Sequence, residues 1–452
     1  QVFDESTLEA LKGHVAVGHA RYSTTGASTW HNAQPTFRPT ADGSIALAHN
    51  GNLTNTHELK GLVEGLPSDR GELDIQARQL ENSTNDTSLV TALLAHHPDT
   101  SLEERAAELL PQIHGAFSFI WMDEGSLYAA RDPQGIRPLV LGRLERGWVV
   151  ASETAALDIV GASYIREVEP GELVVVDEDG LRTRRFAEPA PKGCLFEYVY
   201  LARPDTLLND RRVHSVRVEA GRRLAHADSV VSGPVDADLV IPVPESGTPA
   251  AIGYAEASGI PYGTGLVKNS YVGRTFIQPS QTIRQLGIRL KLNPLRDVIE
   301  GKRLVVVDDS IVRGNTQRAL VRMLREAGAR EVHVRISSPP VKWPCFYGID
   351  FASRAELIAN GLSTDEICAS IGADSLAYIS LEQLIEATDV PADQLCRACF
   401  DGVYPVELPD PALLGKHLLE TVPSPAVESP LDVDGLTVSV SGGGAVDALD
   451  RP

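Results

Sequence analysis

The stretch from Arg303 to Gly328 constrains the fold more than any other part of the chain. Its residues 304–307 form a short apolar run rich in valine, which is typical of a strand buried on both faces of a parallel sheet. From Gln317 onward, apolar residues recur at helical spacing, and Gly328 stands where a helix would be capped. The stretch therefore predicts a buried strand that leads through a short turn into a helix.

The turn between this strand and helix carries an unusual set of polar groups. Asp308 and Asp309 follow the strand directly, and the residues up to Thr316 include hydroxyl groups, a glycine and a basic side chain. Acids at the carboxyl end of a parallel strand face the crevice in which such sheets bind ligands. The start of the helix directs backbone N–H groups toward an anion. The turn could hold a phosphate while its acids hold hydroxyl groups or a metal, although the acids alone fit a solvated loop equally well.

A related unit precedes this one. The chain predicts a strand at 239–243, the loop PESGTP, a helix at 249–257 and a strand at 262–267. Alternating strands and helices of this kind form an α/β domain with a parallel sheet. Ser246 in the loop is expected at the same sheet edge as Asp308, where it belongs either to an ordinary turn or to a ligand site.

The string VVVDDSIVRGNT resembles the phosphoribosyl pyrophosphate (PRPP) loop of type I phosphoribosyltransferases. The resemblance implies that the paired acids contact the ribose hydroxyl groups, that the backbone wraps the 5-phosphate, and that Ser246 and the acids hold Mg2+. The PRPP-binding residues that it implies in this loop are Asp308, Asp309, Ser310, Ile311, Val312, Arg313, Gly314, Asn315 and Thr316.

The segment 268–293 is basic within an acidic chain, and its Gly and Pro content argues against one rigid element. A solvated loop is one interpretation. A mobile lid that closes over PRPP and brings cations to the leaving pyrophosphate explains the charge better. The segment closely matches the flexible loop of PRPP amidotransferases, which implies PRPP binding by Lys268, Arg274 and Lys291, although Ser270 stands where an arginine is expected.

The first part of the chain reads as an α+β pattern rich in antiparallel strands. Strands are expected at 14–22 and 44–49, helices at 87–96 and 102–113, short strands over 116–153 and a hairpin at 171–186. Three polar strings occur here, GHARYSTTG at 18–26, AHNGNLTN at 48–55 and STNDTS at 83–88.

These strings contain the groups that glutamine hydrolysis requires. Arg21 could grip a carboxylate at two points, Asn50 and Gly51 could stabilise an oxyanion, and Asp86 could hold an ammonium group. Each is an ordinary turn or surface residue when taken singly. In this order the strings resemble the glutaminase domain of N-terminal-nucleophile amidotransferases, an αββα sandwich. The resemblance implies that Arg21 binds the α-carboxylate of glutamine, Asp86 its α-amino group, and Asn50 with Gly51 the tetrahedral oxyanion.

The nucleophile of that family is a cysteine at the mature N-terminus. This sequence begins at Gln1, has no cysteine before Cys194, and opens inside the expected domain. We therefore expect either that residues precede Gln1 in the intact protein or that the chain as given accepts ammonia but not glutamine.

Four of the five cysteines form a candidate ligand set, and they are Cys194, Cys345, Cys396 and Cys399. A CxxC pair with two remote cysteines suits one metal or cluster. Structural zinc fits the count equally well, and chance burial is the remaining interpretation. The four contexts resemble those of the glutamine PRPP amidotransferases that carry a [4Fe-4S] cluster, which implies such a cluster here. Cys368 matches no ligand context and is expected in the core.

The 452 residues divide at the Pro-rich connector EPAPKG. We expect a glutaminase domain, truncated at its start, at 1–187, a phosphoribosyltransferase domain with the cysteine set at 188–408, and a helix with a disordered tail at 409–452. The formal net charge of −20 argues against nucleic acid or an acidic membrane as a partner. No apolar run is long enough to span a bilayer, and no signal peptide is evident, so a cytoplasmic protein is expected.

The resemblance covers residues 13–406, and on its motifs the chain is identified as a member of the amidophosphoribosyltransferase family. Membership implies the first committed step of purine synthesis, with glutamine and PRPP as substrates, purine nucleotides as feedback inhibitors and a homotetrameric assembly. Alternatives are ammonia-dependent transfer alone, another glutamine amidotransferase, and a non-catalytic PRPP-binding regulator. The other amidotransferases lack the VVVDDSIVRGNT loop, and a regulator would be expected to carry a basic DNA-binding module.

Overall fold

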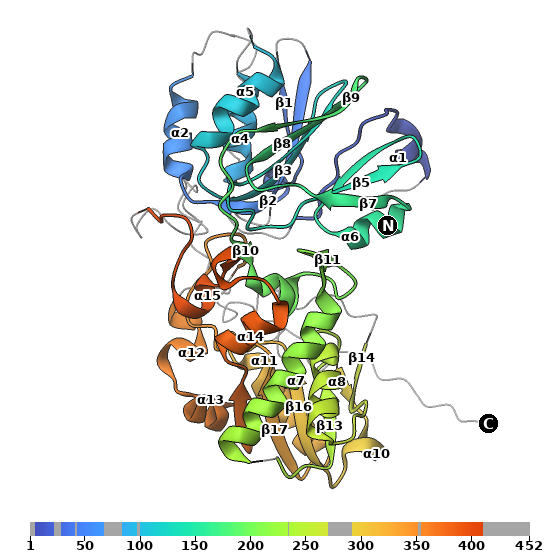
Figure 1. The fold of residues 1–452 in the computed structure, drawn as a ribbon, viewed down its shortest axis with the longest axis vertical. Helices are drawn as coiled ribbons and strands as arrows, with labels where there is room; N and C mark the ends of the chain where they lie inside the picture. Colours follow the sequence, from blue (N-terminus) through green and yellow to red (C-terminus); the bar gives the residue numbers. More distant parts are fainter. Residues whose placement is uncertain are drawn as a thin grey trace, which may run out of the picture.

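The computed structural model describes residues 5–21, 29–40, 43–66, 84–96, 100–233, 235–269, 292–350 and 354–409. Figure 1 shows two lobes, which we call the first lobe and the second lobe. The first is built from the blue-to-green part of the chain and the second from the green-to-red part. The predicted division at 187 and 188, and the one at 408 and 409, stay predictions. The predicted helix and tail at 409–452, apart from residue 409 itself, lie outside the described residues.

The first lobe contains two antiparallel sheets. In the described part of the chain the larger has the strand order β1-β2-β3-β4-β8-β9 and the smaller has the order β6-β5-β7. Their bounds are β1 Thr36–Pro39, β2 Ser44–Leu53, β3 Gly115–Met122, β4 Leu127–Arg131, β5 Val140–Leu144, β6 Gly147–Ala151, β7 Ser163–Glu167, β8 Glu172–Asp177 and β9 Gly180–Arg185. The strands and the hairpin predicted between 116 and 186 are thereby confirmed.

Helices cover the outer face of each sheet. They are α2 (Thr56–Glu64), α4 (Asp86–Ala95), α5 (Leu102–Leu109) and α6 (Thr154–Val160). The first three bury Leu94 and its neighbours against Trp121 of the larger sheet. Leu157 of α6 packs on the smaller sheet, and the two sheets meet through residues such as Val150 and Val174. This is the αββα sandwich that the sequence predicted (Figure 1).

The second lobe is organised around the strand predicted at 304–307. Its described four-stranded sheet has the order β13-β16-β17-β18, and every pair is parallel. The bounds are β13 Leu239–Pro242, β16 Arg303–Asp308, β17 Glu331–Ile336 and β18 Ser375–Tyr378, with helices α7 Val213–Ser232, α8 Thr248–Ser258, α11 Asn315–Glu326 and α13 Thr364–Ile371. Val305 and Val307 of β16 pack toward α7 and α8, whereas Leu304 and Val306 pack toward α11 and α13. Both faces of β16 are therefore buried, because successive strand residues face opposite sides.

The remaining described elements are short. They are α1 (Glu5–Ala10), η1 (Trp30–Asn32), η2 (Leu110–Gln112), β10 (Gly193–Cys194), η3 (Glu197–Leu201), β11 (Leu207–Leu208), β12 (Arg211–Arg212), β14 (Leu266–Lys268), β15 (Leu292–Pro294), α10 (Arg296–Ile299), η5 (Arg354–Glu356), α12 (Ile358–Gly361), α14 (Leu381–Thr388), η6 (Ala392–Gln394), β19 (Leu395–Cys396) and α15 (Ala398–Asp401). None of the described helices combines the length and the apolar character that crossing a bilayer requires.

Two local strand predictions were wrong. Residues 14–21 form no strand, because their alternating pattern has no neighbouring strand in the described part of the chain with which to form a ladder. Within the segment predicted at 262–267, Tyr262 makes only an isolated parallel bridge to Val240, and the strand β14 begins at Leu266 and pairs antiparallel with β15. Pro261, Gly263 and Gly265 interrupt that segment, and both residue types weaken a strand interior.

Two glycines set the closest approach of α7 and α8. A Cβ atom on Gly253 would lie 1.9 Å from the carbonyl oxygen of Val218, and one on Gly221 would lie 1.9 Å from that of Ala250. We expect Gly253→Ala to force the helices apart and to lower the free energy of unfolding by about 1–3 kcal/mol. Differential scanning calorimetry measures this. Gly61→Ala is the control, because a Cβ there meets nothing within 4 Å; equal stability of Gly253→Ala and the parent would contradict the packing.

Candidate functional site

The predicted PRPP turn and the PESGTP loop meet at the carboxyl edge of the parallel sheet. Gly247 packs so closely on the end of β16 that a Cβ atom on it would lie 2.4 Å from the carbonyl oxygen of Val307. This approach brings Ser246 close to Asp309, and the serine hydroxyl lowers the pKa of that carboxyl group. The loop serine and the acid therefore lie together at one sheet edge.

The paired acids are buried at the end of β16. Asp308 and Asp309 are only 6% and 7% exposed. The backbone N–H of Asp309 donates to Oδ1 of Asp308 at 2.9 Å, Nε2 of Gln317 donates to its Oδ2, and the hydroxyl of Ser310 donates to Asp309. Burial raises the pKa of both acids, and repulsion from Asp309 raises that of Asp308 further. A cation bound here would relieve the cost of burying two like charges side by side.

The start of α11 offers backbone donors next to these acids. Gly314 precedes the helix with a φ of 76°, and no side chain caps the first turn. A Cβ atom on Gly314 would also lie 2.7 Å from Cδ1 of Ile358, so glycine suits both the conformation and the space. Because the first N–H groups of a helix have no intrahelical partner, this turn can bind a phosphate group.

The predicted lid residues are only partly described. Nζ of Lys268 lies 2.9 Å from the carboxylate of Glu245, in the loop that carries Ser246. Arg274 and Lys291 lie outside the described residues. Arg313, in the PRPP turn itself, is 3.7 Å from the carboxylate of Glu356.

In the first lobe, Asp86 begins α4 beside the end of β2. The backbone N–H of Leu53 donates to its Oδ2 at 3.0 Å, and that of Thr87 donates to its Oδ1 at 2.9 Å. Nδ1 of His49 is 3.6 Å from the same carboxylate. Burial alone would raise the pKa of Asp86, but His49 and the two backbone donors lower it overall. Asp86 therefore remains an anion whose oxygens are already engaged by the chain.

Arg21 lies in the electrostatic field of Asp86. His19 is in the same place, and burial, followed by the charges of His49 and Arg21, lowers its pKa to about 4. The structure thus places near each other the two residues that the sequence predicted for the α-carboxylate and the α-amino group of glutamine, and it adds two histidines. His19 and His49 both lie inside the polar strings, directly before Ala20 and Asn50. Their place in these strings is the sequence feature that could have predicted them as site residues.

The predicted oxyanion residues follow His49 on β2. Gly51 has a φ of 148°, and a Cβ atom on it would lie 2.0 Å from the carbonyl oxygen of Ala116 on β3. Oδ1 of Asn50 accepts a hydrogen bond from Nε of Arg137 at 3.3 Å. No sequence pattern predicts this contact, because Arg137 stands in an ordinary turn and is 87 residues away from Asn50.

The candidate cysteines come from separate segments and gather between the lobes. Cys194 and Cys396 are register partners in the parallel pair of β10 and β19. Burial, and then the proximity of the other three thiols, raises the pKa of Cys399. No group of three or more His, Cys, Asp or Glu side chains in the described part of the chain is arranged to hold a metal ion. Cys368 lies apart on α13, where its thiol is 3.4 Å from the carbonyl oxygen of Ala373.

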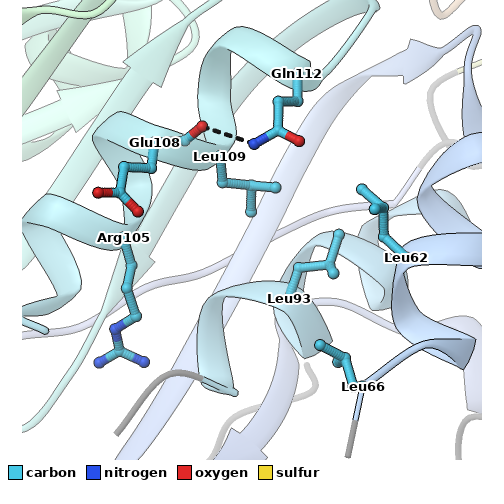
Figure 2. Close-up of a pocket in the computed structure, with 7 residues that line it drawn as sticks. All are labelled: Leu62, Leu66, Leu93, Arg105, Glu108, Leu109 and Gln112. Carbon is cyan, nitrogen blue, oxygen red and sulfur yellow. Dashed lines mark hydrogen bonds between the residues drawn. The ribbon is translucent and has the colours of Figure 1, made fainter. Parts of the chain in front are cut away.

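A separate pocket opens on the helical face of the first lobe (Figure 2). Its lining residues are Leu62, Leu66, Leu93, Arg105, Glu108, Leu109 and Gln112. Nε2 of Gln112 donates to the carbonyl oxygen of Glu108 at 2.9 Å. None of the predicted site residues lines this pocket, so we assign it no part in the chemistry.

Comparison with known proteins places these sites in a family. Residues 19–158 match the model of a glutamine amidotransferase domain. The chain is 65% identical over 427 residues to the amidophosphoribosyltransferase of Mycobacterium leprae, which covers 93% of this chain and 75% of that protein. It is 45% identical to the amidophosphoribosyltransferase of Bacillus subtilis over 93% of this chain and 86% of that one.

Solved structures agree with these matches. The glutamine PRPP amidotransferase of Bacillus subtilis, complexed with ADP and GMP, superposes with a TM-score of 0.76 at 45% identity, covering 87% of this chain and 83% of that chain. A structure described as the allosteric regulatory enzyme of purine biosynthesis gives a TM-score of 0.78 at 45% identity, covering 89% and 84%. From the extent of these matches and from the two sites described above, we conclude that this chain belongs to the amidophosphoribosyltransferase family.

Proposed function

We infer that this chain catalyses the first committed step of purine synthesis. It would convert glutamine, PRPP and water into 5-phosphoribosylamine, glutamate and pyrophosphate. The observation that carries this inference is the buried Asp308–Asp309 pair at the carboxyl end of β16, next to an uncapped helix start. It stands in a chain that matches amidophosphoribosyltransferases over 93% of its length.

The second lobe would hold PRPP and stabilise charge. As pyrophosphate leaves, C1 of the ribose gains positive charge, and the two aspartates would hold the sugar hydroxyl groups and offset that charge. The N–H groups at the start of α11 would hold the 5-phosphate. Neither acid need transfer a proton. Ser246, Asp308 and Asp309 would hold Mg2+, which supplies positive charge against the pyrophosphate oxygens.

The first lobe would release ammonia from glutamine. Arg21 would bind the α-carboxylate, and Asn50 with the backbone of Gly51 would stabilise the oxyanion formed when the family's N-terminal cysteine attacks the amide. Asp86 would bind the α-amino group by sharing oxygens that now accept from backbone N–H groups. Because free ammonia is mostly protonated in neutral water, a closed passage between the sites would keep it reactive.

Pyrophosphate release tests this function directly. With PRPP, Mg2+ and ammonium chloride at alkaline pH, the purified complete protein is expected to release pyrophosphate and form phosphoribosylamine. Glutamine should replace ammonia as the donor. No release with either donor would reject the transferase assignment, and release with ammonia alone would confine the activity to the second lobe.

We also propose that Cys194, Cys345, Cys396 and Cys399 hold a [4Fe-4S] cluster. In the described residues the four side chains are not arranged around a metal ion, so the proposal rests on the backbone. Cys194 pairs with Cys396 across β10 and β19, and Cys194 and Cys345 pack against the clusters that contain Cys396 and Cys399. Such a cluster would cross-link the segments that join the two lobes. Soft thiolate ligands suit iron–sulfur clusters and zinc alike, so the metal must be measured.

The purified protein is therefore expected to be brown and to contain iron. Cys345→Ser should remove the iron and the visible absorption, because it removes a ligand. Cys368→Ser, the control, should keep both, since Cys368 lies on α13 with its thiol 3.4 Å from the carbonyl oxygen of Ala373. Elemental analysis and absorption spectra measure the effect, and a colourless, zinc-loaded protein that is active would reject the cluster.

Two further properties are proposed from the family alone. The solved Bacillus subtilis relative holds ADP and GMP, which supports feedback inhibition of this chain by purine nucleotides. A homotetramer in the cytoplasm is the assembly and location we propose.

A further inference from the structure

Arg137 is a buried cation that touches both lobes. It follows β4 in the first lobe and is 8% exposed. Its Nε donates to Oδ1 of Asn50 at 3.3 Å. Its Nη1 lies 2.9 Å from Oε1 of Glu197 in the second lobe. Among the described residues neither of these two buried atoms makes a hydrogen bond, so the ion pair is the polar contact that compensates the burial of each.

The contact with Asn50 fixes the direction of a side-chain amide. An amide group presents an acceptor at one end and donors at the other, and the two ends have nearly the same shape. A donor held against Oδ1 makes the flipped orientation unfavourable, because the flip would bring the NH2 group against the guanidinium. The Nδ2 hydrogens are then left for another acceptor, such as an oxyanion. A flipped amide would present oxygen to that anion and repel it.

Glu197 is itself held firmly from the second lobe. It begins the π-helical turn η3, and Arg217 on α7 binds the carbonyl oxygens of this turn. Nε of Arg217 donates to Tyr198 at 2.7 Å, and its Nη2 donates to Ala202 at 2.8 Å. The charge of Asp309 in the PRPP turn also acts on Arg217. Arg217 therefore holds the turn that carries Glu197 and lies in the electrostatic field of the acid pair.

The same part of β2 has two other contacts with the second lobe. Nδ2 of Asn52 donates to the carbonyl oxygen of Phe346 at 3.0 Å. Gly348 approaches so closely that a Cβ atom on it would lie 3.0 Å from Cα of Gly51. The segment next to Cys345 thus packs directly on the strand that carries the oxyanion residues.

We propose that Arg137 is a positioning residue for Asn50, and that Glu197 of the second lobe holds Arg137 in place. The proposal rests on the proposed function, since it assigns the orientation of an oxyanion donor in the glutaminase half. It means that the first lobe is fully competent for glutamine hydrolysis only when the second lobe packs against it through Glu197.

Three variants of the complete protein test this. Arg137→Met removes the donor and the charge, and it is expected to lower kcat for glutamine hydrolysis about 10²-fold, as loss of one oxyanion donor does. KM for glutamine should change less than about threefold, because Arg137 is not among the residues proposed to bind glutamine. Ammonia-dependent pyrophosphate release should stay within about twofold of the parent.

Arg137→Lys is the second variant, because it keeps the charge opposite Glu197 and so protects the fold, but a single ammonium replaces the planar fork. It is expected to lose at least about tenfold in glutaminase kcat with an unchanged unfolding midpoint. Glu197→Gln should also lower the glutaminase kcat. The Arg137→Met/Glu197→Gln double variant should have a glutaminase kcat no lower than that of Arg137→Met alone, because both changes remove the same ion pair.

Arg143→Met is the matched control, since Arg143 is an exposed cation of the same lobe that stacks on Trp148; it should leave both activities unchanged. Full glutaminase activity in Arg137→Lys, or an equal fall of ammonia- and glutamine-dependent rates in the Arg137 variants, would overturn the proposal. The activity of the parent protein with each nitrogen donor tests the proposed function by itself. The ratio of glutamine-dependent to ammonia-dependent activity in the Arg137 variants tests the positioning role.

Discussion

Asp309→Asn is expected to abolish the turnover of PRPP while leaving the fold intact. Asparagine has nearly the same shape, and its amide oxygen can still accept the hydrogen bond from Ser310, but it carries no negative charge to offset the positive ribose or to bind a cation. We expect kcat/KM for PRPP to fall by about 10³-fold, which corresponds to about 4 kcal/mol of transition-state stabilisation. Pyrophosphate release with ammonia as the donor measures this without involving the first lobe.

The stability of the Asp309→Asn variant shows whether Asp309 serves the PRPP site or the fold. Burial raises the pKa of Asp309, so its negative charge is a cost to the folded state, and the neutral amide should not lower the melting temperature. Asp365→Asn, an exposed acid on α13, is the control and should keep full activity. Normal turnover by Asp309→Asn would remove the acid pair from the site, and a large loss of stability would make its role structural.

Gly51→Ala is expected to eliminate glutamine hydrolysis and to spare ammonia-dependent transfer. The new methyl group would lie 2.0 Å from the carbonyl oxygen of Ala116 and 2.8 Å from Nε2 of His49, so β2 must move away from β3. That movement displaces the backbone N–H of Gly51 together with Asn50. We expect the glutaminase kcat to fall by about 10³-fold, the upper end of the loss that removal of one oxyanion donor causes.

Glutamate release and pyrophosphate release, measured side by side, check this result. Gly125→Ala in the turn between β3 and β4 is the matched control, because a Cβ there meets nothing within 4 Å. It should retain both activities. Glutamine hydrolysis at the parent rate in Gly51→Ala would show that the oxyanion is stabilised elsewhere.

Local patterns were sufficient to predict most elements of the second lobe. The valine-rich run of β16 and the helical spacing of apolar residues in α11 are patterns of residues close in sequence. Both elements formed as predicted, because the residues that these patterns mark as apolar are the ones that the fold buries. The strand at 262–267 was predicted too long, since the glycines on either side of Thr264 weaken the ladder. The strand at 14–22 failed for a different reason, because a strand needs a partner that no local pattern can supply.

The sequence by itself determined the acid pair, the serine loop, the polar strings and the cysteines, because these are compact motifs whose chemistry is written in adjacent residues. Only the tertiary structure decided that Gln317 turns back onto Asp308, that His49 joins Asp86, and that Arg137 links Asn50 to Glu197. These contacts join residues that local spacing does not pair. A charged side chain needs a polar or oppositely charged partner when it is buried, because an unpaired buried charge is costly. The packing of segments that are distant in sequence determines which partner that is.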